Sequence, residues 1–149
     1  MNYPHAVIVE DNFHDIEMIK DALDNTGKNI STVVFRDGAE AMKYFFDPEN
    51  KAQSQTHWLP MFILLDLKLP KINGLEVLKL LKSDKKTKCV PVVIFTSSNE
   101  TRDRMESYEL GANSYLVKPL DADVFYDYIK QIVNYWAVIN TNAPHAGNI

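Results

Sequence analysis

Five polar side chains in this sequence follow short apolar runs, and their types suit phosphate and metal chemistry. They are Glu10 and Asp11 after Ala6–Val9, Asp66 after Met61–Leu65, Thr96 after Val90–Phe95, and Lys118 after Ser114–Val117. Apolar runs of this length are typical of strands buried on both faces of a parallel sheet. Because ligands bind at the carboxyl ends of such strands, we expect the five side chains to converge at one edge.

Three acids, a hydroxyl and an ammonium at one edge favour phosphoryl transfer. Crowded carboxylates repel one another unless a cation lies among them, and an all-oxygen site without His or Cys suits Mg²⁺. Phosphoryl transfer needs positioning and charge neutralisation, and a carboxylate can serve as the nucleophile that forms an aspartyl phosphate. Asp66 is the best candidate nucleophile because it stands alone on the central strand. Taken alone, Asp66 could simply begin a loop, but the polar groups at the other exits argue against that reading.

Helical segments alternate with the strands. A further strand is predicted over Ser31–Arg36, and apolar spacing predicts helices that begin after Asn12 and over Ala39–Phe46, Gly74–Lys82, Asn99–Leu110 and Ala122–Ile139. This fivefold β-α alternation predicts an α/β fold in which helices cover both faces of a parallel sheet. We expect one domain over residues 1–139 and a polar C-terminal tail over 140–149 that frays. A long polar loop is predicted over residues 47–60, with Trp58 as a lid over the core or as part of a partner surface.

Composition narrows the class of protein. The 149 residues suit a single domain, and the net charge of −4 disfavours a dedicated nucleic-acid binder. No apolar run is long enough to span a membrane, and Met1–His5 lacks the features of a signal peptide, so a cytoplasmic protein is expected. Cys89, the one cysteine, is expected to be a small buried residue in a reducing compartment.

The sequence resembles the receiver domains of two-component response regulators over about Ala6 to Val138. The motifs are Val-Glu-Asp-Asn at 9–12, Leu-Leu-Asp-Leu-Lys-Leu-Pro-Lys-Ile-Asn-Gly at 64–74, Phe-Thr-Ser-Ser at 95–98 and Gly-Ala-Asn-Ser-Tyr-Leu-Val-Lys-Pro at 111–119. The resemblance implies a flavodoxin-like, doubly wound (βα)5 fold with strand order 2-1-3-4-5. One departure is Glu10, where many members have Asp; the extra methylene favours metal contact through water.

The resemblance also assigns roles to single residues. It implies that Asp66 is the phosphoacceptor, that Thr96 and Lys118 bind the phosphoryl group, and that Tyr115 turns inward when Thr96 engages the phosphate. It implies a Mg²⁺ site formed by Glu10, Asp11, Asp66 and the backbone carbonyl of Lys68. It further implies a cis peptide bond before Pro119.

The long loop and the Leu-Leu-Asp-Leu-Lys-Leu-Pro-Lys run resemble the small regulators paired with cyanobacterial phytochromes, and, as in those regulators, we expect no output domain. The expected partner is therefore a sensor histidine kinase of the phytochrome type, and the chain is expected to be a phosphoacceptor rather than a turnover enzyme. Two alternatives remain open. One is a Mg²⁺-dependent phosphohydrolase, although Lys68 stands where those enzymes usually have a second acid. The other is a receiver-like binding module that is not phosphorylated.

The last predicted helix has an apolar stripe wider than one buried face needs. We expect part of the stripe to form a two-fold homodimer, together with the strand and helix before it, because exposed apolar patches usually mark interfaces. The interface candidates are Phe125, Tyr128, Ile132 and Trp136. The alternative is a helix that the tail buries more fully.

Overall fold

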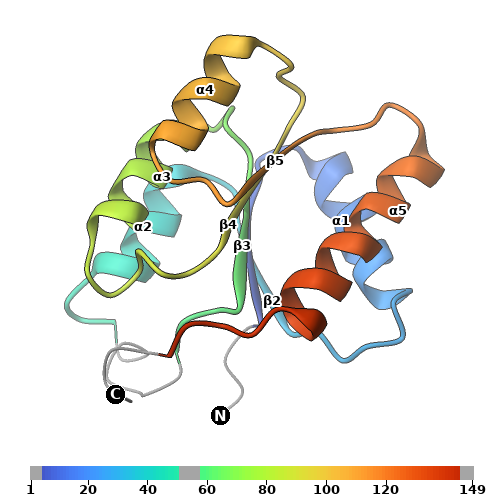
Figure 1. The fold of residues 1–149 in the computed structure, drawn as a ribbon, viewed down its shortest axis with the longest axis horizontal. Helices are drawn as coiled ribbons and strands as arrows, with labels where there is room; N and C mark the ends of the chain where they lie inside the picture. Colours follow the sequence, from blue (N-terminus) through green and yellow to red (C-terminus); the bar gives the residue numbers. More distant parts are fainter. Residues whose placement is uncertain (1–4, 51–57, 145–149) are drawn as a thin grey trace.

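Five parallel strands form the middle layer of the protein, in the order β2-β1-β3-β4-β5 (Figure 1). We obtained a computed structural model, which describes residues 5–50 and 58–144. The strands are β1 (Ala6–Val9), β2 (Thr32–Phe35), β3 (Phe62–Leu65), β4 (Val92–Thr96) and β5 (Ser114–Val117). They alternate with the helices α1 (Phe13–Asp24), α2 (Gly38–Phe46), α3 (Gly74–Ser83), α4 (Thr101–Glu109) and α5 (Ala122–Val133). This is the flavodoxin-like α/β fold with the predicted strand order.

The strands are in register, so their carboxyl ends lie level along one edge. Val9 at the end of β1 pairs with Phe35 of β2 and Leu65 of β3, and Thr96 of β4 pairs with Val117 of β5. The residues that follow these strand ends therefore emerge side by side, which confirms the predicted convergence.

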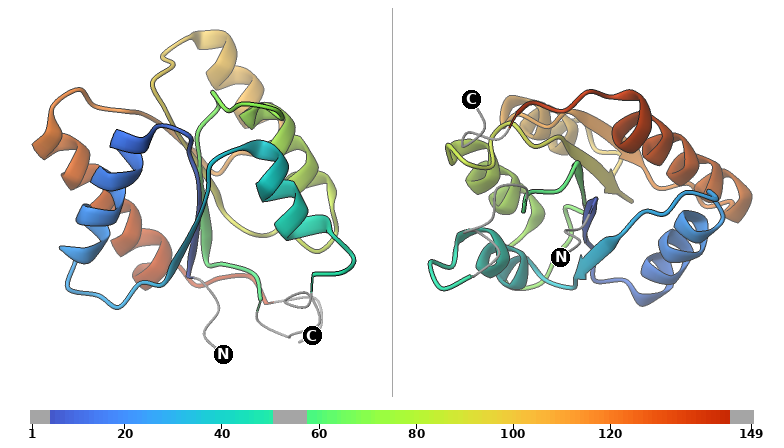
Figure 2. Two further views of the ribbon diagram at one scale, coloured as in Figure 1. Left: turned by 180° about the vertical axis from the view of Figure 1, so that it is seen from behind. Right: turned by 90° about the horizontal axis from the view of Figure 1, so that it is seen from below.

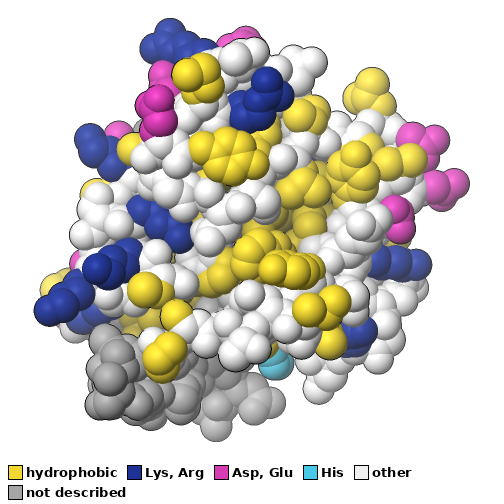
Figure 3. All heavy atoms as spheres, in the orientation of Figure 1, with side chains coloured by type: hydrophobic (Ala, Val, Ile, Leu, Met, Phe, Trp, Pro, Cys, Tyr) yellow, Lys and Arg dark blue, Asp and Glu magenta, His cyan; other side chains and the backbone are white. Residues whose placement is uncertain are grey.

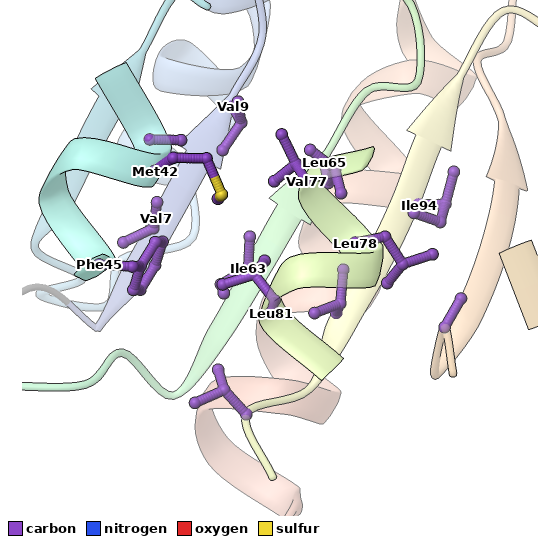
Figure 4. Close-up of a cluster of buried hydrophobic side chains, with 14 of the residues drawn as sticks. Val7, Val9, Met42, Phe45, Ile63, Leu65, Val77, Leu78, Leu81 and Ile94 are labelled. Atoms are coloured by element: carbon purple, nitrogen blue, oxygen red, sulfur yellow. The ribbon is translucent and has the colours of Figure 1, made fainter. Parts of the chain in front are cut away.

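Helices cover both faces of the sheet. Helices α1 and α5 pack on one face, whereas α2, α3 and α4 lie on the other (Figures 1 and 2). Alternate strand residues point to opposite sides, so each face has its own apolar core. Figure 4 shows the core beneath α2 and α3, where Phe45, Leu78 and Leu81 meet the side chains of Ile63 and other strand residues. The long apolar runs of β1, β3 and β4 are buried on both faces, as expected for a parallel sheet.

Four helices begin at a side-chain cap in the segments that follow the strands. Asn12, Asp37, Asn73 and Asp121 each accept a hydrogen bond from the backbone N–H three residues later, at the starts of α1, α2, α3 and α5. Such caps satisfy a backbone donor that the helix itself leaves unpaired. They fix where each helix leaves the loops that carry the polar side chains.

The last helix differs from the prediction at its end. Regular α-helix ends at Val133, and the chain continues as a wider π-helical segment, η2 (Asn134–Ile139). Within the ranges 5–50 and 58–144, no helix is both long and apolar enough to cross a membrane. Of the predicted loop and tail, residues 51–57 and 145–149 lie outside the described part of the chain.

The structure also tests the predictions made for Trp58 and Cys89. Trp58 is buried against the rings of Tyr44 and Phe45, with ring centroids 5.9 and 6.0 Å away, so its interpretation as a lid over the core is confirmed. The prediction for Cys89 is wrong: this residue is exposed, because it lies in the loop between α3 and β4 rather than in the strand.

Candidate metal and phosphoryl-transfer site

Lys118 lies at the centre of the polar edge of the sheet. Its backbone N–H donates to the carbonyl of Thr96 at 2.7 Å, which extends the pairing of β5 with β4 by one residue. Its side chain is only 9% exposed, and its ammonium Nζ contacts three carboxylates. The distances are 2.5 Å to Glu10 Oε1, 2.8 Å to Asp15 Oδ2 and 2.9 Å to Asp66 Oδ2. The structure therefore joins the exits of β1, β3 and β5 through one cation.

Asp66 is buried at the end of β3, and neighbouring backbone holds it in place. Its N–H donates to the carbonyl of Val9 at 3.0 Å, and its Oδ1 accepts the N–H of Lys68 at 3.2 Å. Behind it, the start of α3 packs so closely that a Cβ on Gly74 would overlap the backbone of Asp66 and Leu67. Glycine at 74 is thus required for the loop after Asp66 to lie against α3.

Glu10, Asp11 and Asp66 form a cluster of acids that could hold a metal ion. One carboxylate oxygen from each residue lies within 4.8 Å of the others. Glu10 is buried, and its Oε2 accepts the N–H of Asn12 at 3.1 Å, whereas Asp11 is exposed. Oxygen ligands of this kind fit Mg²⁺ or Mn²⁺.

The electrostatics of the cluster favour added positive charge. Burial, followed by the negative charge of Asp66, raises the pKa of Glu10 to about 8, although Lys118 opposes that shift. Burial alone would lower the pKa of Lys118, but the charges of Glu10 and Asp66 outweigh burial and raise this pKa. A single ammonium therefore does not neutralise the site, and a divalent cation would relieve the remaining repulsion.

Thr96 and Tyr115 lie on neighbouring strands beside the acids. Thr96 is fully buried at the end of β4, and its Oγ1 accepts the N–H of Ser98 at 3.4 Å. Tyr115 is half-buried on β5, and its hydroxyl donates to the carbonyl of Ser98 at 2.9 Å. Ser98 thus links the hydroxyl of Thr96 to that of Tyr115 through its backbone.

Two further acids contact residues at this edge, and neither was predicted from the sequence. In the sequence Asp15 is one of the polar residues between the apolar positions of α1, yet it contacts Lys118. Asp103 in the first turn of α4 lies with its Oδ2 2.5 Å from the Oγ of the buried Ser98. Both acids are the third residue of a helix that begins at the polar edge. That position is the one feature of the sequence that could have pointed to them.

Three predicted features are wrong. Among residues 5–50 and 58–144 no peptide bond is cis, so the bond before Pro119 is trans, the state that most X-Pro bonds adopt in folded proteins. Phe125 and Ile132 cannot be interface residues, because both are buried in the core between α5 and the sheet. The ring of Phe125 lies 5.1 Å from that of Phe95 on β4. The apolar stripe of α5 thus serves the core at these positions.

The fold and the acidic edge define a receiver-type α/β domain, and comparison with known proteins gives the family. Residues 6–130 match the family described as the response regulator receiver domain, so this chain belongs to that family. It is 35% identical over 130 residues to the probable methanogenesis regulatory protein FilR2 of Methanothrix harundinacea, covering 87% of this chain and 81% of FilR2. It is 32% identical over 136 residues to the response regulator Rcp1 of Synechocystis, covering 91% and 90% of the two chains.

Comparison with solved structures also finds response regulators. The phosphorylated cyanobacterial phytochrome response regulator RcpA superposes with a TM-score of 0.86 at 36% identity, covering 95% of this chain and 99% of RcpA. The Mn²⁺-bound form of Rcp1 superposes with a TM-score of 0.83 at 30% identity, covering 94% and 99%. The family and its phytochrome-regulator relatives therefore match the resemblance seen in the sequence.

Proposed function

We propose that this chain is a response regulator that accepts a phosphoryl group on Asp66 from a sensor histidine kinase of the phytochrome type. The observation that carries the proposal is the position of Asp66. Its carboxylate is buried in an acid cluster and lies 2.9 Å from Lys118 Nζ at the edge where five strands end.

In the proposed reaction, a carboxylate oxygen of Asp66 attacks the phosphorus atom of a phosphohistidine. A new O–P bond forms, the P–N bond breaks, and the histidine nitrogen leaves with the electron pair. Lys118 is close enough to pair with an oxygen of the transferred group, because its Nζ already contacts the carboxylate. Positioning and charge neutralisation of this kind are the main contributions a protein makes to phosphoryl transfer.

Glu10, Asp11 and Asp66 would hold the metal ion, with the backbone carbonyl of Lys68 as a further ligand. The crowding of three carboxylates and the raised pKa of Glu10 support this assignment. A bound Mg²⁺ supplies neutralisation of the phosphoryl oxygens during transfer. The Mn²⁺ in the structure of the relative Rcp1 also supports it.

The switch would run through Thr96 and Tyr115. The phosphoryl group adds a charge of about −1.5 to −2, which would attract the hydroxyl of Thr96. The backbone carbonyl of Ser98 accepts from the hydroxyl of Tyr115, and its N–H donates to Thr96. A shift of Thr96 would therefore move the loop that holds Tyr115. The output is then a change of surface over β5 and the β4–α4 loop.

Relatives support a phytochrome-type kinase as the partner, because RcpA is described as a phytochrome response regulator. A purified, autophosphorylated phytochrome kinase should transfer its phosphoryl group to this chain faster than an unrelated histidine kinase does. Equal or slower transfer from the phytochrome would remove that part of the proposal and leave the receiver function in place.

A second part of the proposal is a homodimer through the face formed by α4, β5 and α5. Apolar side chains gather between α4 and α5 on this face (Figure 3). The exposed apolar residues of these elements include Met105, Tyr108, Val117 and Val124. They replace Phe125 and Ile132 as the candidates, while Tyr128 and Trp136 are partly buried against the core.

The function is tested by incubating the protein with acetyl phosphate and Mg²⁺ while following its intact mass and the release of inorganic phosphate. The proposal predicts one added phosphoryl group per chain, with acetate as the leaving group, and no addition in Asp66→Asn. In a parallel incubation with a phosphomonoester, sustained release of phosphate would instead indicate the phosphohydrolase. An unmodified chain, with both acetyl phosphate and a kinase as donor, would indicate a binding module.

A further inference from the structure

Asp15 gives Lys118 a third carboxylate partner, from a part of the chain 103 residues away. Its Oδ2 lies 2.8 Å from Lys118 Nζ, and its side chain is 19% exposed. This contact is as short as the one between Lys118 and Asp66, at 2.9 Å. Asp15 is neither the phosphoacceptor nor a member of the acid cluster.

The position of Asp15 in α1 would ordinarily suggest a different task. It is the third residue of the helix, and its N–H donates to the Oδ1 of the N-cap Asn12 at 3.0 Å. An acid at this position often reaches back to accept the N–H of the N-cap residue. Here the N–H of Asn12 donates to Glu10 Oε2 at 3.1 Å instead. The carboxylate of Asp15 is therefore directed to Lys118 and does not close the cap.

The three partners of Lys118 differ in what happens to them during the reaction. Glu10 and Asp66 both belong to the acid cluster, and Asp66 also forms the new bond to phosphorus. Both carboxylates would therefore share their charge with other groups once metal and phosphoryl group are bound. Asp15 stands outside that cluster, on a helix whose start is fixed by a side-chain cap, so neither event takes its carboxylate away from Lys118.

We propose that Asp15 is a positioning residue for phosphoryl transfer, which holds the Lys118 ammonium beside Asp66 while the other two carboxylates are engaged elsewhere. A lysine has a flexible four-carbon stem, so a fixed charged partner reduces the conformations that its ammonium must leave before it meets the phosphoryl oxygen. This inference rests on the proposed function of Asp66 as the phosphoacceptor.

The experiment compares three variants of the full chain. Asp15→Asn removes the charge and keeps the shape, Asp15→Glu restores a carboxylate, and Glu17→Gln makes the same charge change at an exposed position of α1. The rate of phosphorylation by acetyl phosphate with Mg²⁺ should fall about tenfold in Asp15→Asn, recover in part in Asp15→Glu and stay unchanged in Glu17→Gln. An unchanged rate in Asp15→Asn, or an equal loss in Glu17→Gln, would overturn the proposal.

A double-mutant cycle shows whether Asp15 acts through Lys118. In a Lys118→Ala background, Asp15→Asn should cause no further loss of rate, and an undiminished loss there would overturn the proposal. The cycle is repeated on the free energy of unfolding in metal-free protein, where a coupling between the two positions is expected and its absence would also refute the contact. If the wild-type chain itself is not phosphorylated, the proposed function fails, which is distinct from a failure confined to Asp15→Asn.

Discussion

At the scale of single residues, the candidate site carries more negative charge than its one lysine can neutralise. Lys118 contacts the carboxylates of Glu10, Asp15 and Asp66, and the exposed Asp11 lies in the acid cluster with Glu10 and Asp66. Burial and the negative charge of Asp66 raise the pKa of Glu10 to about 8, so the carboxyl group of Glu10 holds a proton at neutral pH. The metal-free site is therefore poised to exchange a proton for a cation, and metal binding should release protons near neutral pH.

This protonation predicts how stability depends on pH. In the unfolded chain Glu10 titrates near 4.5, so between that pH and about 8 the folded protein holds a proton that the unfolded chain has released. The contribution of Glu10 to stability is complete below about pH 4.5 and is lost as the pH rises to about 8. Urea unfolding with a chelator present measures it. The difference in unfolding free energy between wild type and Glu10→Gln should shift against the wild type across this range, whereas parallel curves would contradict the assignment.

At the scale of elements, the loop after Asp66 is positioned by two helix starts that carry glycine. A Cβ on Gly74 would overlap the backbone of Asp66 and Leu67, and one on Gly38 would overlap the backbone of Ile72. The N-terminal ends of α2 and α3 thus clamp the segment that links β3 to α3. The sequence of the loop provides the acid, and the two helices hold it in place.

The clamp predicts that Gly74→Ala damages both stability and the site. The added methyl meets backbone rather than a movable side chain, so the loss of unfolding free energy should be about 3 kcal/mol, the upper part of the range for overpacking. Phosphorylation should slow as well. Gly27→Ala is the control, because Gly27 has φ +70° but open space around it. It should lose about 1 kcal/mol and keep its phosphorylation rate. Equal effects of both substitutions on the rate would refute the clamp.

Prediction from sequence succeeded where a local pattern determines the outcome. Uninterrupted apolar runs located β1, β3 and β4, and parallel pairing then brought Asp66 and Lys118 to one edge. It failed where contacts between distant segments decide. The helical pattern of α1 marks Asp15 only as a polar residue between apolar ones, because its partner lies 103 residues away. It also could not separate core from surface in α5, since an apolar stripe looks the same whether Phe125 packs on a sheet or on a second chain.

At the scale of the whole molecule, one face combines the switch with an exposed apolar surface. Tyr115 and the exposed Val117 both lie on β5. This strand follows α4, which carries the exposed Tyr108, and precedes α5, which carries the exposed Val124. Figure 3 shows apolar side chains grouped over this face. A rearrangement of Tyr115 would therefore alter the surface through which the proposed dimer forms.

The dimer is tested with Val124→Glu, which places a charge on this face at little cost to the fold. Position 124 is the third residue of α5 after the cap Asp121, where glutamate is favoured. Sedimentation at tens of micromolar, with and without acetyl phosphate, should show a dimer for wild type and a monomer for Val124→Glu, with phosphorylation retained. Leu80→Glu on the exposed side of α3 is the matched control and should remain dimeric. A monomeric wild type under both conditions would contradict the proposal.

The most direct test of the central claim is the location of the phosphoryl group. After treatment with acetyl phosphate and Mg²⁺, reduction with borohydride converts an aspartyl phosphate to homoserine, which peptide mass spectrometry can place in the chain. The account predicts homoserine at position 66 alone and none in the Asp66→Asn variant. Homoserine at Asp11 or Asp15, or a modification that survives in Asp66→Asn, would contradict it.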